Sequence, residues 1–411
     1  MTNACVLLQA FVSSLYMGRM DGIMRDTMLQ EFIRVFGDKE NVTCFFAPGR
    51  VNLIGEHTDY NGGHVFPCAL TIGTYAVARK RNDRVLQFYS MNFEKEGVIT
   101  ASLDDMINRP EQAWANYPIG VLKTLVDAGY AVDCGMDILY NGTIPNSSGL
   151  SSSASIEVLT AFIAKIFFGL NLDFVEISKL TQKAENLFIG VNCGIMDQFA
   201  IAMGKKNHAI FLDTADLSYT YAPIALNGMK LIIACSNKKR GLGDSKYNER
   251  RSQCEEALRR LQTVCKVNSL GELTEEEFET NRSVIADAIL EKRAKHAVYE
   301  NRRTIHAVKA LQENDVKRFG ELMNQSHISL RDDYEVTGIE LDTLVEEAWK
   351  QDGVIGSRMT GAGFGGCTVS IVEETAVDKF IAQVGEAYEK KIGYAADFYV
   401  VEIGDGPIVI E

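Results

Sequence analysis

The sequence predicts an α+β protein built from two domains. Its 411 residues are enough for two or three domains of roughly 100–200 residues each. Hydrophobic residues make up 46% and charged residues 24% of the chain, which is the composition of an ordinary globular protein. Helix-like and strand-like segments are mixed through both halves. They do not follow the regular βαβα order of a doubly wound sheet, and this favours α+β.

Helices are predicted where apolar residues recur about every 3.6 residues. Such segments cover residues 25–36, 115–128, 155–168 and 173–188, and a longer helical region with breaks runs from 246 to 350. Strand-like runs cover residues 65–78, 231–236, 367–372 and 397–403. Pro223 and Gly228 separate two strand-like segments, so we place the domain boundary within residues 221–228.

The chain is acidic, because 42 Lys and Arg residues against 55 Asp and Glu residues give a formal net charge of −13. Such a chain repels polyanions, so we expect neither nucleic acid nor a membrane as a partner. No apolar run reaches the ~18 residues that a membrane-spanning helix needs. An anionic ligand must therefore be held by local groups, against the field of the whole protein.

Nine cysteines are scattered along the chain without a Cys-x-x-Cys pair, and six histidines show no metal-ligand spacing. This pattern predicts reduced thiols in the cytoplasm rather than a disulfide framework or a zinc site. The apolar stretch 4–16 is not preceded by a basic residue and contains Gln9, Ser13 and Ser14. These features argue against a secretory signal.

A segment rich in Ser and Gly, IPNSSGLSSSAS at 144–155, leads into a predicted helix. Small residues let the backbone approach a ligand, and the unpaired N–H groups of a helix N-terminus can hold phosphates without a basic patch. A Ser-rich loop that only caps the helix has the same composition, so both interpretations stay open here. No Gly-Lys-Ser/Thr follows, which excludes a Walker A loop.

The segment GAGFGG at 361–366 matches the glycine pattern of a dinucleotide-binding fingerprint. That fingerprint follows a strand and opens a helix, whereas a strand-like run follows here at 367–372. The context therefore argues against a Rossmann site. It predicts a loop packed closely against another backbone, for which the Ser-rich segment is a candidate.

A third segment, APGRVNLIGEHTDYNGG at 47–63, places several kinds of polar group between turn residues. Glu56, His57 and Asp59 offer donors and acceptors suited to sugar hydroxyls, and Arg50 can hold a phosphate or a carboxylate at two points. A plain turn with a surface ion pair would need fewer such groups, so a binding loop is favoured. His57 alone would equally suit a hydrogen-bonded core histidine.

In this order and spacing, the three segments resemble those of the GHMP superfamily of sugar and metabolite kinases. GRVNLIGEHTDYNGG at 49–63 is similar to the signature of the galactokinase family, and the segments at 184–198, 245–257 and 329–342 also read like that family. The resemblance implies a two-domain GHMP kinase fold, α+β with mixed sheets and helices and an active site in the cleft between the domains. The N-terminal domain would span 25–223 and the C-terminal domain 224–411. Residues 1–24 fall outside the pattern, and we expect this extension to be dispensable.

The resemblance also implies a role for individual residues. Asp197 and Arg50 would be catalytic, and Ser153 and Glu185 would bind Mg²⁺. The sugar would be bound by Glu56, His57, Thr58, Asp59 and Tyr247. ATP would be bound by Ser90 and by the phosphate-loop residues Ser147, Ser148, Gly149, Leu150, Ser151, Ser152 and Ser153. Without the resemblance, Glu185 would be taken for a solvated helix residue and Asp197 for a cap or a surface acid.

The implied reaction is transfer of the ATP γ-phosphoryl group to the C1 hydroxyl of α-D-galactose, by a monomer in the cytoplasm. One alternative is a related GHMP sugar kinase for N-acetylgalactosamine, galactosamine or arabinose, because selectivity at C2 depends on the shape of the pocket. Another is a galactose sensor without catalysis. The intact residues Glu185, Asp197 and Arg50 argue against a sensor.

Overall fold

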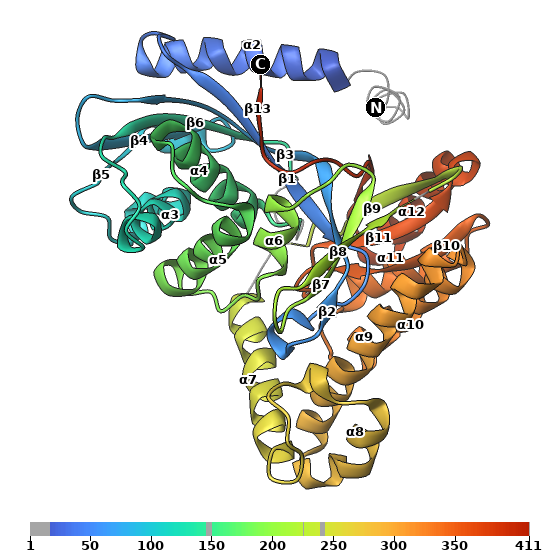
Figure 1. Ribbon diagram of the computed structural model, residues 1–411. Helices are drawn as coiled ribbons and strands as arrows, with labels where there is room; N and C mark the ends of the chain where they lie inside the picture. Colours follow the sequence, from blue (N-terminus) through green and yellow to red (C-terminus); the bar gives the residue numbers. More distant parts are fainter. Residues whose placement is uncertain (1–16, 145–149, 225, 239–242, 411) are drawn as a thin grey trace.

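The computed structural model describes residues 17–144, 150–224, 226–238 and 243–410. Within these residues the strands form sheets of six, four and three strands, and helices cover them (Figure 1). The predicted α+β class is confirmed. Among the described residues, none of the helices has the length and apolar character needed to cross a membrane.

The six-stranded sheet forms the first layer. Its strand order is β13 (Ile408–Ile410), β1 (Thr43–Asn52), β3 (Pro67–Lys80), β6 (Met136–Gly142), β4 (Val85–Ser90) and β5 (Ile99–Ser102). The β4–β6 pair is parallel and the other pairs are antiparallel. Because β13 lies near the C-terminus, the end of the chain returns to the sheet that begins the fold.

Helices cover both faces of this sheet (Figure 1). Successive side chains of a strand point to opposite faces, and β1 shows this alternation. Cys44 packs with α2 (Met17–Phe36) through Met28 and Phe32. Its neighbour Phe45 packs in the larger core with Val158 and Leu159. The helices of that core are α3 (Asn116–Asp127), α4 (Ser152–Phe168) and α5 (Phe174–Ala184).

The second, antiparallel sheet has the order β10 (Val354–Thr360), β11 (Cys367–Glu373), β9 (Met229–Cys235) and β12 (Asp397–Val401). One face packs against α11 (Ile339–Trp349) and α12 (Val377–Ile392) through Ile232 and Phe380. The other face contributes Ile233 to a core that also holds Val51 and Phe319. This core joins residues from both halves of the chain.

The predicted helical region 246–350 is confirmed as a series of separate helices. They are α7 (Gly243–Leu261), α8 (Glu275–Asn281), α9 (Ala288–Gln312), α10 (Val316–Asp332) and α11. Side chains of α7, α8 and α9 form a separate core that includes Cys254, Phe278 and Ala294. In Figure 1 these helices extend downward, away from the six-stranded sheet.

A small three-stranded sheet connects the two larger ones in the sequence. It has the order β2 (His64–Val65), β7 (His208–Asp213) and β8 (Tyr219–Pro223). The predicted domain boundary lies in the connection from β8 to β9. The division into 25–223 and 224–411 stays a prediction, as does the dispensability of 1–24, although α2 already begins at Met17.

Several predicted elements have different limits in the structure. The strand expected over 65–78 is interrupted at Phe66 and forms β2 and β3. The helix expected over 173–188 ends as α5 at Ala184 and continues as a π-helical turn, Glu185–Ile189. The short helix α6 (Met196–Ala202) was missed, because seven residues are too few to show a helical period.

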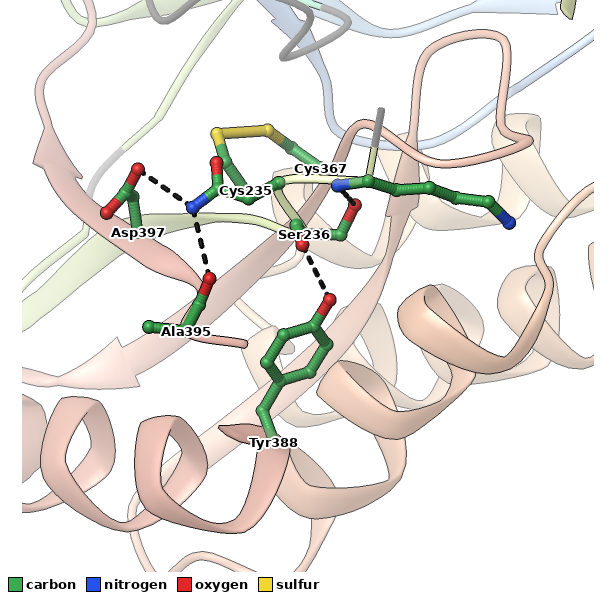
Figure 2. Close-up of a disulfide and its surroundings, with 8 residues drawn as sticks. Cys235, Ser236, Cys367, Tyr388, Ala395 and Asp397 are labelled. Carbon is green, nitrogen blue, oxygen red and sulfur yellow. Dashed lines mark hydrogen bonds between the residues drawn. A yellow bond between two sulfur atoms is a disulfide. The ribbon is translucent and has the colours of Figure 1, made fainter. Parts of the chain in front are cut away.

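The expectation of reduced thiols is wrong at one pair. Cys235 and Cys367 form a disulfide, shown in Figure 2, and their Cα atoms are 4.2 Å apart. The two residues are direct cross-strand partners of β9 and β11. They are separated by 132 residues in the sequence, so cysteine spacing alone could not pair them.

Candidate active site

The structure brings Arg50 and Asp197 into a two-point contact. Arg50 lies in β1, where the pairing with β3 shifts register between Pro48 and Arg50, and Asp197 lies in the first turn of α6. Arg50 donates from Nε to Asp197 Oδ1 at 2.7 Å and from Nη2 to Oδ2 at 2.6 Å. Burial opposes the charge of Arg50, but Asp197, Glu56 and Asp59 together raise the pKa of the guanidinium.

The phosphate-loop candidate meets the same aspartate. Ser151 precedes α4 in a left-handed conformation, with φ 61°, and its hydroxyl donates to Asp197 Oδ2. Ser151 makes no side-chain cap to α4, so the interpretation of the segment as a loop that only caps the helix has no support at this serine. Leu150 is buried and its carbonyl accepts from the Arg50 N–H at 3.3 Å. Ser152 is exposed at the start of α4. Ser147, Ser148 and Gly149 lie outside the described residues.

Glu56 links the sugar-loop candidate to the third glycine-rich segment. Its carboxylate is 1% exposed, and Oε1 accepts from Gly361 N at 2.8 Å, Thr360 Oγ1 at 3.0 Å and Arg358 Nη1 at 3.3 Å. Gly361–Gly366 therefore joins β10 and β11 and holds the Glu56 loop. It packs closely against a second backbone at Val336, not against the described part of the phosphate loop.

His57 and Thr58 are buried side by side, with different partners. His57 has a positive φ of 60°, and burial, assisted by the charge of His296, lowers the pKa of its ring to about 3. The ring is therefore neutral at pH 7. The Thr58 hydroxyl donates to the carbonyls of Gly55 and His64, so this residue shapes the loop.

Asp59 lies against the loop that precedes α6. Its Oδ2 accepts from Met196 N at 3.4 Å, and a Cβ on Gly194 would lie 1.8 Å from the same oxygen. Only glycine permits this approach. Burial, followed by the charge of Asp197, raises the pKa of Asp59 to about 7. Two carboxyl groups, Asp59 and Asp197, thus lie close enough to influence each other's charge.

Tyr247 reaches this loop from α7. Its ring centroid lies 5.6 Å from that of His57 and 5.5 Å from that of Tyr60. Burial and the charge of Asp59 hold the pKa of Tyr247 well above its usual value, so its hydroxyl keeps its proton. The structure therefore brings His57, Asp59 and Tyr247 together, whereas the Glu56 carboxylate binds Thr360 and Gly361.

The predicted metal ligands adjoin each other. Ser153, in the first turn of α4, lies close enough to the buried Glu185, which is 7% exposed, to counteract the rise in the pKa of that carboxyl. Burial and the charge of Asp197 raise the pKa of Glu185 to about 6. A hydroxyl and a carboxylate are the hard oxygen donors that Mg²⁺ prefers, so the donor set fits the ion. Among the described residues, no group of three or more His, Cys, Asp and Glu could hold a metal by itself.

Two further residues beside Glu185 were not predicted. Gln198 Nε2 donates to Glu185 at 2.6 Å and to Glu157 at 3.1 Å. Glu157 is fully buried in α4, and burial together with the charge of Glu185 raises its pKa well above the usual value. Glu157 lies one helical turn after Ser153 in a mostly apolar helix, and this unusual position could have indicated the site. Gln198 gave no such signal.

Ser90 lies in a different environment from the other predicted site residues. It ends β4, is 4% exposed, and its hydroxyl accepts from Asn92 N at 3.2 Å. No described contact joins it to the residues around Asp197. Its assignment to the nucleotide stays a prediction.

Each of the three glycine-rich segments lies within a range of this chain that matches a known protein family. Residues 30–80 match the galactokinase galactose-binding signature, residues 116–205 the GHMP kinases N terminal domain and residues 307–390 the GHMP kinases C terminal domain. A galactokinase of Clostridium beijerinckii is 62% identical over 381 residues, which cover 93% of this chain and 98% of the relative. A galactokinase of Bacillus subtilis is 54% identical over 383 residues, with 93% and 98% covered.

Solved structures show the same relationship. Lactococcus lactis galactokinase complexed with galactose is similar with a TM-score of 0.93 and 50% identity, over 94% of this chain and 100% of that one. A mevalonate kinase shares the fold with a TM-score of 0.61 at 19% identity, over 88% of this chain and 98% of its own. Sequence and structure agree over nearly the whole chain, and we conclude that it belongs to the galactokinase family of the GHMP kinases.

Proposed function

We propose that this chain transfers the γ-phosphoryl group of ATP to the C1 hydroxyl of α-D-galactose, producing galactose 1-phosphate and ADP. The observation that carries the proposal is the two-point contact of Arg50 with Asp197, to which Ser151 of the phosphate loop also donates. This contact lies beside Asp59 of the sugar loop. The similarity to a galactokinase complexed with galactose supports the choice of sugar.

Phosphoryl transfer proceeds through a loose transition state, so positioning and charge stabilisation supply most of the rate. Asp197 accepts the proton of the C1 hydroxyl as the oxygen–phosphorus bond forms. Arg50 fixes both carboxylate oxygens and offsets negative charge on the transferring group. Glu56, His57, Asp59 and Tyr247 bind the other sugar hydroxyls and hold C1 toward Asp197.

ATP binds with its phosphates at the N-terminus of α4, where backbone N–H groups point outward. Ser153 and Glu185 would hold Mg²⁺, which would neutralise charge on the phosphates when bound. Burial, followed by the charge of Asp197, raises the pKa of Glu185, and a cation beside it would offset this effect. We further propose a cytoplasmic monomer whose ligands are galactose and ATP, with no nucleic acid or membrane partner.

The test is a coupled assay of ADP release with galactose, glucose, N-acetylgalactosamine and arabinose, each at several concentrations. We expect the highest kcat/KM with galactose. A higher kcat/KM with another of these sugars would identify a different GHMP sugar kinase. Tight ATP binding without turnover of galactose would support the sensor and contradict the proposal.

A further inference from the structure

A row of hydrogen-bonded side chains lies behind His57. His57 Nδ1 is 2.7 Å from the hydroxyl of Tyr60, which is 2.7 Å from the hydroxyl of Tyr334, which in turn is 3.2 Å from Cys254 Sγ. These four side chains, called the His57 row below, come from the sugar loop, the end of α10 and α7. The mechanism above assigns no task to the last three.

Three of the four side chains of the His57 row are enclosed by the protein. Tyr334 and Cys254 are fully buried, and His57 is 4% exposed. The ring centroids of His57 and Tyr334 lie 4.8 Å apart, and the ring centroid of His296 lies 4.5 Å from that of Tyr334. Tyr60 is half-buried. Because the other three groups are buried, they find their hydrogen-bond partners mainly within the row.

Arginine side chains fix the backbone that carries Tyr334. Arg250 donates from Nε to the Tyr334 carbonyl at 2.8 Å and from Nη2 to the Glu335 carbonyl at 3.2 Å. Arg293 donates from Nη1 to the Asp333 carbonyl at 2.6 Å. Three consecutive carbonyls after α10 are thus held by α7 and α9, and the Tyr334 hydroxyl has a defined place. The segment 329–342, to which the mechanism assigns no other task, thus holds the Tyr334 hydroxyl in place.

The row can be polarised in two directions, since each hydroxyl has one proton to donate. In one direction Tyr334 donates to Tyr60 and Tyr60 donates to His57 Nδ1, which leaves the ring proton on Nε2. In the other, Nδ1 donates and the row ends on the sulfur of Cys254. A thiol sulfur is a weak acceptor, whereas an imidazole nitrogen is a good one, so the first direction is favoured.

The environment of the ring agrees with this direction. His57 Nε2 is buried and has no hydrogen-bond partner among the described residues. A proton on Nε2 therefore has no acceptor among these residues, and a sugar hydroxyl is a suitable one.

We propose that Tyr60 and Tyr334 are positioning residues that fix His57 in the tautomer with its proton on Nε2, so that the ring meets the sugar as a hydrogen-bond donor. The inference rests on the proposed sugar site. Glu56 and Asp59, when ionised, can only accept hydrogen bonds. With His57 as a donor, the same loop can both donate a hydrogen bond to a sugar hydroxyl and accept one from it. Sugar specificity then depends on residues that do not touch the sugar.

The first measurement is the tautomer, read from the ¹⁵N shifts of the full-length chain. The chain has six histidines, and the His57 signals are assigned by their loss in His57→Gln. We expect the Nε2–H pattern in the wild type, a mixture of tautomers in Tyr60→Phe, and a smaller change in Tyr334→Phe. A wild-type ring with its proton on Nδ1 would overturn the proposal.

The second measurement separates positioning from a structural role. In Tyr60→Phe we expect the KM for galactose to rise roughly 10-fold, with the KM for ATP and kcat nearly unchanged. Tyr334→Phe should raise the same KM less, because Tyr60 can still donate to the ring. Tyr388→Phe is the control, since it also removes a buried hydroxyl, one that donates to the Ser236 carbonyl at 2.6 Å.

An unchanged galactose KM in Tyr60→Phe, or an equal loss in kcat and in both KM values, would overturn the proposal. Failure of the proposed function is distinguishable, because it would show as absent galactose turnover by the wild type. The ¹⁵N measurement would then still decide whether Tyr60 sets the tautomer.

Discussion

The guanidinium of Arg50 donates to both carboxylate oxygens of Asp197, at 2.7 and 2.6 Å, across 147 residues of sequence. Arg50 is nearly buried, whereas 29% of the Asp197 side chain is exposed. The buried arginine thus fixes the position of the aspartate, and part of the Asp197 side chain stays accessible to a ligand.

Replacement of Asp197 by Asn should lower kcat by at least ~10²-fold, because the amide cannot accept the C1 proton. Sugar binding and folding should persist, since Asn has nearly the same shape. Steady-state rates and calorimetric galactose titration check this. Asp216→Asn, in an exposed turn, is the control and should leave both unchanged. A kcat near the wild-type value would remove Asp197 from the mechanism.

Replacement of Arg50 by Lys should lower kcat/KM by ~10–100-fold, because a single ammonium cannot meet both carboxylate oxygens as the planar guanidinium does. The matched control is Arg84→Lys, at a half-exposed ion pair with Asp104. Initial rates with galactose and ATP provide the measurement. Equal kcat/KM for Arg50→Lys and the wild type would show that charge alone suffices at this position.

Replacement of Asp59 by Asn should stabilise the ligand-free protein, and more so at higher pH. The ordinary pKa of Asp is 3.8 and the folded protein raises it to about 7, so the folded state binds more protons between these values. Stability of the wild type therefore falls as pH rises from about 4 to about 7. The Asn variant lacks this loss, which amounts to at most ~4 kcal/mol.

Urea denaturation of both proteins at about pH 5 and about pH 8 measures this difference. The gain in free energy of unfolding from Asp59→Asn should be larger at the higher pH. Parallel values at the two pH values would contradict the raised pKa. The same variant should bind galactose more weakly, because it lacks one carboxylate acceptor.

Replacement of Gly194 by Ala should displace Asp59, since the new Cβ would lie 1.8 Å from Oδ2. We expect kcat/KM for galactose to fall ~10²-fold, the cost of a shift of about 1 Å in a positioning group. The KM for ATP should change much less. Gly22→Ala, with no atom within 4 Å of the new Cβ, is the control. Unaltered galactose kinetics in Gly194→Ala would show that the loop adjusts without moving Asp59.

The sequence was sufficient to identify the three glycine-rich segments, because each has unusual composition and polar residues in fixed order. Arg50, Glu56 and Asp59 could be assigned to a binding loop on their chemistry alone. The strand after residue 366 also excluded a Rossmann site correctly. Helices with clear apolar periods, such as α4, were found for the same reason.

Contacts between distant segments were beyond the reach of the sequence. Arg358 and Thr360 contact Glu56 only because β10 packs against the sugar loop. Thr360 lies 304 residues from Glu56 in the sequence. Gln198 is an unremarkable helix residue until α6 packs beside α4. Cys235 and Cys367 pair through the register of two strands. In each case the signal lies in tertiary packing, which local propensity does not contain.

The most direct test of the account is the chemical identity of the product. The wild-type chain is incubated with galactose, ATP and Mg²⁺, and the product is analysed by ³¹P–¹H correlation NMR. We predict a phosphorus nucleus coupled to H1 of α-galactose, as expected when Asp197 faces the C1 hydroxyl. Phosphorus coupled to the protons at C6, or no phosphorylated galactose at all, would contradict the central claim.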